Sequence, residues 1–212
     1  ILYALIIMLT PFGFGYIISY PSPALPYFRS RWSISDFQAT VFNAVSSLTA
    51  IFGPYLNNFL LKYFGRRKVT FILSLSALIG WALLFALKES IFFFGIIVRA
   101  ILGLIMGAFS AIGPLYLAEI SPPELTGFFG SLNQLAIVLS IILIFIVGEF
   151  QPSWALNVLA IVTHALQCIL LRFVPETNVI IKSGDEKHEE LIKKESICQK
   201  KYAKNIMICV CL

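Results

Sequence analysis

Residues 91–118 read IFFFGIIVRAILGLIMGAFSAIGPLYLA, an apolar run in which Arg99 is the one charged residue. A helix needs about 20 apolar residues to cross the hydrocarbon core of a bilayer, and this run is longer than that. It also lacks the alternation of period two that a membrane-spanning strand would show. The stretch therefore predicts an α-helix that crosses a membrane.

Five further apolar stretches occur along the chain, separated by charges, prolines and glycines. They cover residues 1–28, 37–64, 69–87, 128–147 and 154–174. Of the 212 residues, 58% are hydrophobic and 13% are charged, whereas soluble domains average about 25% charged residues. This composition excludes an ordinary soluble protein and a disordered chain. It predicts an all-α membrane protein with six spans.

The composition changes near Glu176, after the expected bundle of residues 1–175. Residues 176–204 are mostly charged and polar, which predicts a linker of short amphipathic helices in water. Residues 205–212 are apolar again, but this run is too short to cross a bilayer. We interpret it as the start of a seventh span, and a hydrophobic tail lying against the bundle is the alternative.

Basic residues are concentrated on one side of the expected bundle. Of 16 lysines and arginines, 12 follow the second span, end the sixth span or lie in the tail: Lys62, Arg66, Arg67, Lys68, Arg172, Lys182, Lys187, Lys193, Lys194, Lys200, Lys201 and Lys204. Because basic loops of membrane proteins face the cytoplasm, we expect both termini to be cytoplasmic. The net charge of +5 therefore reflects membrane topology, and we expect no nucleic-acid partner.

Arg99 is a charge inside a span. A guanidinium in hydrocarbon costs several kcal/mol unless it is paired or faces water. Its side chain could snorkel to the outer surface, because it lies near the outer end of its span. The alternative is a charge beside a solute pathway. Gly103 and Gly107 follow, four residues apart, as in the small-xxx-small motif of packed membrane helices. This spacing predicts close packing of the helix against a neighbour.

Catalytic constellations are missing from the sequence. Both aspartates, Asp36 and Asp185, lie outside the spans, which excludes a membrane aspartyl protease, and there is no G-x-S-x-G elbow. Cys209 and Cys211 form a C-x-C pair without a nearby histidine. We therefore expect no enzyme, no metal site and no other cofactor.

Residues 114–127, between the fourth and fifth spans, read PLYLAEISPPELTG. This segment closely resembles the signature of the sugar porter family of the major facilitator superfamily, which includes glucose and trehalose facilitators. Gly65-Arg66-Arg67, Arg99 and Pro175-Glu176-Thr177 resemble three further motifs of that family, in the same order along the chain. The resemblance covers nearly the whole chain. It implies the N-terminal six-helix bundle of a twelve-span transporter that works by alternating access.

The resemblance also implies roles for individual residues. Phe14 and Gln134 match residues that line the sugar site. A second set matches the cytoplasmic gate and charge network of the family: Gly65, Arg66, Arg67, Arg99, Glu119 and Glu176. The implied partners are the lipid bilayer, a small neutral sugar, and a missing C-terminal six-helix half or a second copy of the chain.

The chain departs from the family pattern at several charged positions. Proton-coupled members carry an aspartate where this sequence has Ile17, which removes the usual partner of Arg99. Lys62, Thr126 and Val179 also replace charged residues expected in the gate motifs. We therefore predict a facilitative uniporter. The resemblance implies a hexose or disaccharide as its substrate, and we expect it in the plasma membrane. A proton-coupled symporter, a non-transporting sugar sensor and a degenerate transporter remnant are the alternatives.

Overall fold

The computed structural model describes residues 2–32, 34–121, 125–150, 153–174 and 176. The chain forms two compact units, residues 1–177 and residues 178–212. The second unit lies outside the described residues. Apart from Glu176, so do the expected linker at 176–204 and the expected seventh span at 205–212.

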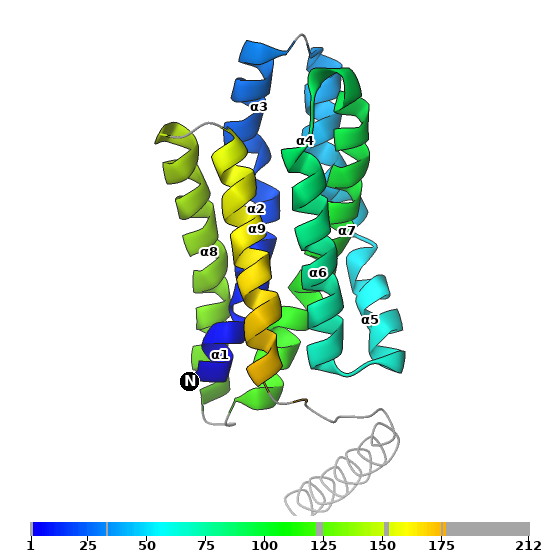
Figure 1. The fold of residues 1–212 in the computed structure, drawn as a ribbon. Helices are drawn as coiled ribbons and strands as arrows, with labels where there is room; N and C mark the ends of the chain where they lie inside the picture. The colour runs from blue at the N-terminus through cyan, green and yellow to red at the C-terminus, as the bar shows by residue number, and fades with distance from the viewer. Residues whose placement is uncertain (1, 33, 122–124, 151–152, 175, 177–212) are drawn as a thin grey trace, which may run out of the picture. The chain divides into compact units, whose positions relative to one another are not determined.

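The described part of the first unit is built from helices and contains no strand (Figure 1). Five helical segments are long and apolar enough to cross a membrane, and a bent pair of helices can supply a sixth span. This confirms the predicted all-α bundle. The helices are α1 (Leu2–Ile7), α2 (Leu9–Ser19), α3 (Pro21–Arg31), α4 (Asp36–Ala50), α5 (Gly53–Tyr63), α6 (Arg66–Phe85), η1 (Glu89–Ile91), α7 (Phe92–Ile120), α8 (Thr126–Phe150), α9 (Ser153–Leu170) and η3 (Leu171–Phe173).

The first span consists of α1, α2 and α3, and it runs past the prolines that we expected to end it near residue 28. Pro21 occupies the start of α3, where a missing N–H is tolerated. Backbone bonds continue on both sides of it, from the Tyr20 N–H to the Tyr16 carbonyl and from the Ala24 N–H to the Tyr20 carbonyl. The axis therefore stays helical. However, residue 21 cannot donate to the carbonyl of Ile17, four residues earlier.

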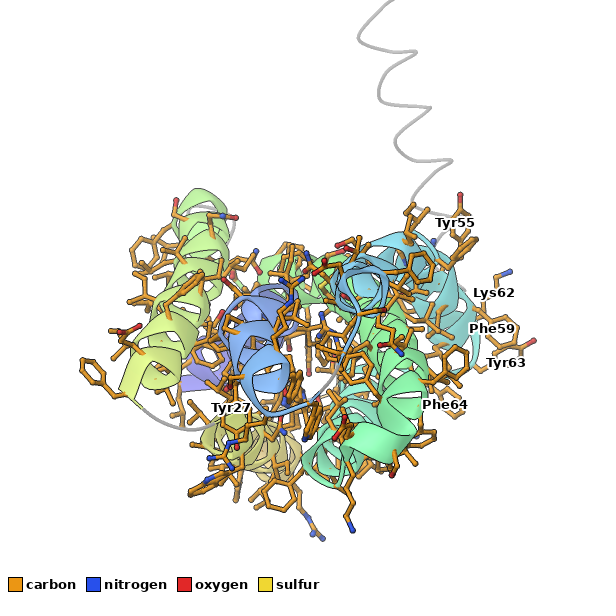
Figure 2. All side chains as sticks on the ribbon, turned by 90° about the horizontal axis from the view of Figure 1, so that it is seen from above. Tyr27, Tyr55, Phe59, Lys62, Tyr63 and Phe64 are labelled. Carbon is orange, nitrogen blue, oxygen red and sulfur yellow. The ribbon has the colours of Figure 1, made fainter. Side chains whose placement is uncertain are left out.

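The second span is the bent pair, in which α4 and α5 meet at 43°. Pro54 explains the break, because it has no N–H to donate to the carbonyl of Ala50. The chain turns at residues 51 and 52 and α5 starts at Gly53. Tyr55, Phe59 and Tyr63 then point outward from α5 (Figure 2).

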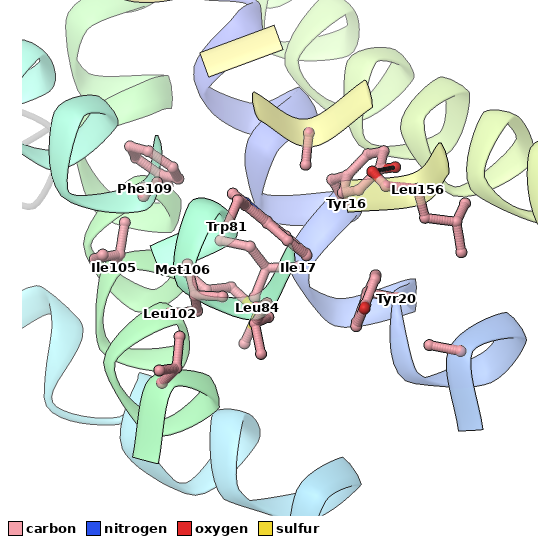
Figure 3. Packing of buried hydrophobic residues seen from close by; sticks show 14 of the residues in the cluster. Tyr16, Ile17, Tyr20, Trp81, Leu84, Leu102, Ile105, Met106, Phe109 and Leu156 are labelled. Carbon is pink, nitrogen blue, oxygen red and sulfur yellow. Dashed lines mark hydrogen bonds between the residues drawn. The ribbon is translucent and has the colours of Figure 1, made fainter. Parts of the chain in front are cut away.

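Trp81 of α6 lies at the centre of the main core. Its ring makes edge contacts with Tyr16 and Tyr20, at centroid distances of 5.5 and 4.9 Å. The Tyr16 hydroxyl donates a 2.7 Å hydrogen bond to the carbonyl of Leu156 in α9 (Figure 3). Tyr16, Tyr20 and Trp81 are all fully buried or nearly so. One aromatic cluster therefore joins the first, third and sixth spans.

The predicted close packing at Gly103 and Gly107 is confirmed, and the neighbour is the second span. A Cβ at Gly103 would lie 2.3 Å from the carbonyl oxygen of Ser46. A Cβ at Gly107 would lie 2.0 Å from that of Ala50, the carbonyl that Pro54 leaves without a helical donor. Only a hydrogen fits in that space. The two glycines thus allow α4 and α7 to cross with their backbones nearly in contact.

Candidate functional site

Most of the candidate gate residues meet at one end of the bundle, at the bottom of Figure 1. Here α5 leads into α6, and α7 and α9 end. We call it the basic end, because it carries Lys62, Arg66, Arg67, Lys68 and Arg172.

Arg66 and Glu119 form a close ion pair that joins α6 to α7. The Nε of Arg66 donates to both carboxylate oxygens of Glu119, at 2.9 and 3.1 Å, and Nη2 lies 2.9 Å from Oε1. The two side chains are only 10% and 17% exposed. Such a forked, charge-assisted contact fixes the geometry of both helix ends. It holds the first turn of α6 against the last turn of α7.

Glu176 forms the second contact, with Arg67. Its Oε2 lies 3.2 Å from Arg67 Nε, and its Oε1 accepts a 3.2 Å hydrogen bond from the Arg67 backbone N–H. Arg67 Nη1 also donates to the carbonyl of Val174 at 3.3 Å. The N-cap residue of α6 is Gly65, which has no side chain to bind the first N–H groups. The carboxylate of Glu176, which is distant in sequence, caps the start of α6 instead.

Gly65 leaves room for the Glu176 carboxylate, whereas its φ of −74° is accessible to any residue. A Cβ at this position would lie 2.0 Å from Glu176 Oε1. Gly65→Ala should therefore displace the carboxylate and expose the Arg67 N–H, lowering the free energy of unfolding by about 1 kcal/mol, the usual value of a helix cap. Hydrogen exchange of the first turn of α6 should accelerate. The matched control is Gly127→Ala, where an added Cβ meets nothing within 4 Å. Equal exchange in both variants would contradict this role of Glu176.

Arg99 lies apart from the basic end and is completely buried. Its Nη1 donates a 3.0 Å hydrogen bond to the carbonyl of Ile17, and its Nη2 donates a 2.7 Å bond to Ser46 Oγ. The carbonyl of Ile17 is the group that Pro21 leaves without its helical donor. The arginine thus supplies the missing donor and ties the first, second and fourth spans together.

Aromatic rings surround the rest of the Arg99 guanidinium. Its central carbon lies 5.7 Å from the ring centroid of Tyr20 and 5.5 Å from that of Phe42. Rings at this distance attract a cation through the electron density of their faces. Among the described residues, no carboxylate contacts Arg99. The side chain does not snorkel to the outer surface, because the bundle covers it entirely.

The two candidate sugar-site residues lie on adjacent helices. Phe14 of α2 is half-buried against the main core, whereas Gln134 of α8 is exposed. Their helices are in tight contact, since a Cβ at Gly15 would lie 2.6 Å from the Ile137 carbonyl oxygen. Phe14 also precedes Ile18 by one helical turn. Ile18 and Asn43 line a pocket of about 340 Å³ between the first and second spans.

Two of the buried contacts, Arg99–Ser46 and Gln167–Thr10, are not predictable from local sequence. Ser46 is a hydroxyl within the second span, but its pairing with Arg99 depends on the crossing of α4 and α7. Gln167 donates a 2.8 Å hydrogen bond to Thr10 Oγ1, and both residues are fully buried. A glutamine in an apolar helix signals such a bond, although not its partner. In the described part of the chain, no group of three or more His, Cys, Asp or Glu residues is placed to hold a metal ion.

The model of the family "Sugar (and other) transporter" matches residues 4–207. The chain belongs to this family. Two curated members are each 32% identical to it: Sugar transporter ERD6-like 6 of Arabidopsis thaliana, over 82% of this chain, and Solute carrier family 2, facilitated glucose transporter member 8 of Bos taurus, over 86%. The chain covers only 35% and 38% of the length of these two relatives. It therefore spans well under half of each.

A solved structure of similar fold is a D-xylose–proton symporter. It superposes with a TM-score of 0.73 at 21% identity, over 91% of this chain and 52% of the symporter. At this identity the match concerns the fold. It agrees with the helical bundle described above, which covers about half of the symporter chain.

Proposed function

We propose that this chain is the N-terminal half of a transporter that moves a hexose or disaccharide across a membrane by alternating access. The observation that carries the proposal is the pair of contacts at the basic end, Arg66–Glu119 and Arg67–Glu176. In a member of the sugar transporter family, these contacts lie on the motif residues expected to close the inner gate. The basic end would then face the cytoplasm, in line with its excess of positive charge.

The form of the two contacts suits a gate. Each joins segments that are far apart in sequence, α6 to α7 and α6 to the residue that follows the sixth span. The Arg67–Glu176 contact is also partly exposed, so that its charges can be rehydrated when the contact opens. A gate of this kind can be broken and remade in every transport cycle.

Facilitative uniport is the transport mode that the surroundings of Arg99 favour. Proton coupling needs a group that takes up and releases a proton near the substrate pathway. The partners of Arg99 are a backbone carbonyl, a hydroxyl and two aromatic rings, and none of them exchanges a proton near neutral pH. A guanidinium held in this way remains charged throughout the cycle.

Sugar uptake into proteoliposomes tests the proposal. The vesicles would contain the chain itself or a longer version of the protein that includes a second six-helix half. We expect saturable uptake of radiolabelled sugar that reaches equilibrium and goes no further when a proton gradient is imposed. Accumulation above equilibrium would indicate symport. Sugar binding without uptake would indicate a sensor, and the absence of both would overturn the proposal.

Gln134→Ala should raise the KM for sugar by about tenfold, because one or two hydrogen bonds to sugar hydroxyls are worth about 1.4 kcal/mol together. The matched control is Ser131→Ala, one turn earlier on the same exposed face of α8, where the hydroxyl bonds to the carbonyl of Gly127 in its own helix. The control should leave KM unchanged. A Gln134→Ala transporter with an unaltered KM would remove Gln134 from the sugar site.

A further inference from the structure

A groove of about 600 Å³ runs between the start of α6 and the end of α9. Its volume lies in the range of small-molecule pockets, about 300 to 1,000 Å³. The two helices pack side by side in both overall views (Figures 1 and 2). The lining is divided by chemistry, with basic side chains at the helix ends and apolar ones deeper in. The basic residues are Arg67, Lys68 and Arg172, and the others are Phe64, Phe71, Ile72, Cys168, Ile169 and Leu171.

The basic part of the groove carries an excess of positive charge. Arg67 is engaged by Glu176, but neither Lys68 nor Arg172 forms an ion pair within the described part of the chain. Both side chains are exposed. Arg and Lys together form the usual protein site for a phosphate group, because they supply several N–H donors as well as charge. In a bilayer spanned by these helices, the groups at the helix ends would lie at the level of the membrane surface.

The apolar part of the groove continues along the outside of both helices. Exposed side chains on α6 recur at each helical turn, at Phe71, Leu75, Ile79 and Leu83. From the first to the last of them the helix rises roughly 18 Å, slightly more than half of the ~30 Å hydrocarbon core. Helix α9 also has exposed apolar side chains along its length, at Val162, Leu166 and Ile169. A surface of this length and composition suits an acyl chain.

We infer that this groove binds an anionic phospholipid of the leaflet at the basic end. The headgroup phosphate contacts Lys68 and Arg172, and one acyl chain lies along Phe71 and the apolar residues beyond it. The spacing of charge and apolar surface fits a lipid, whose anionic group and chain are covalently joined at the membrane surface. A soluble anion would leave the apolar part unfilled. The bound lipid would lie beside the Arg67–Glu176 contact.

Cys168 provides a reporter within the groove, because it is half-buried in its wall. The experiment measures the rate at which N-ethylmaleimide modifies Cys168 in the full chain carrying Cys198→Ser, Cys209→Ser and Cys211→Ser. The protein is placed in nanodiscs of phosphatidylcholine, with or without phosphatidylserine. We expect phosphatidylserine to slow modification several-fold. Inorganic phosphate added to phosphatidylcholine nanodiscs should have no effect.

Single substitutions separate the groove from general surface charge. Lys68→Gln and Arg172→Gln should each remove most of the protection by phosphatidylserine. Lys62→Gln, which removes an exposed lysine of the same end outside the groove, should retain it. Equal rates with and without phosphatidylserine would overturn the inference, and so would equal protection in Lys68→Gln and Lys62→Gln. Protection by inorganic phosphate would assign the site to a soluble anion instead.

Discussion

Arg99→Met should lower the free energy of unfolding of the native chain. The loss should be about 2 kcal/mol larger than the loss that the same substitution causes in a chain carrying Pro21→Ala. In the native chain, Pro21 leaves the carbonyl of Ile17 without a helical donor, and Arg99 supplies that donor at 3.0 Å. Methionine fills much of the same volume but leaves the carbonyl of the fully buried Ile17 unpaired. With alanine at position 21, the backbone N–H is restored and can bond to Ile17 itself. The coupling free energy between the two substitutions therefore measures the cost of leaving the carbonyl of Ile17 unpaired.

The comparison cancels the absolute effect of removing a buried charge, which includes relief of desolvation. Free energies of unfolding in detergent would be measured for the native chain, both single variants and the double variant. Pro26→Ala is the control. Pro26 also lies inside α3, and the carbonyl that it leaves without a helical donor is that of Ser22, to which Arg99 donates no hydrogen bond. Its effect should add to that of Arg99→Met. Additivity for Pro21→Ala as well would contradict this account of Arg99.

Gly107→Ala should lower the free energy of unfolding by about 2–3 kcal/mol, as expected for overpacking a tight interface. The added methyl group would lie 2.0 Å from the carbonyl oxygen of Ala50, and the backbone of α4 cannot move aside without separating from α7. Gly130→Ala is the matched control. Gly130 is also helical but exposed, and a Cβ there meets nothing within 4 Å.

The two alanine substitutions should change the free energy of unfolding in opposite directions. Alanine favours a helix over glycine by up to about 1 kcal/mol, so Gly130→Ala should stabilise the chain slightly. Thermal unfolding in detergent and the yield of monodisperse protein would show the difference. If Gly107→Ala were as stable as Gly130→Ala, the close crossing of α4 and α7 would not contribute to stability.

Hydrophobic length was sufficient to predict the spans, because a buried helix in a membrane needs an uninterrupted apolar run. Residues 91–118 became the body of α7 (Phe92–Ile120) for this reason. The helix ends near proline were predicted less well. The run Pro21 to Pro26 suggested the end of the first span, yet the helix continues to Arg31. Proline removes a donor but does not prevent helical φ, and a partner elsewhere in the fold can bond to the freed carbonyl.

The gate residues were predictable as a set from their motifs, whereas their contacts were not. Nothing in the sequence around Gly65 indicates that the carboxylate of Glu176 caps α6, since the two residues come together only when α6 and α9 pack. Similarly, the identity of Ser46 as a partner of Arg99 depends on two helices crossing at Gly103 and Gly107. Local sequence does not encode such distances.

The sequence by itself determined that this protein is a bundle of membrane-spanning helices and which family it resembles, because hydrophobic length and motif order are properties of the linear chain. The tertiary structure alone decided what Arg99 does within that bundle. A charge in hydrocarbon must find donors and acceptors on neighbouring helices, and the sequence offered two readings, a snorkelling side chain or one beside a solute pathway. The packing of α2, α4 and α7 buries it completely, against a carbonyl that Pro21 had left unpaired.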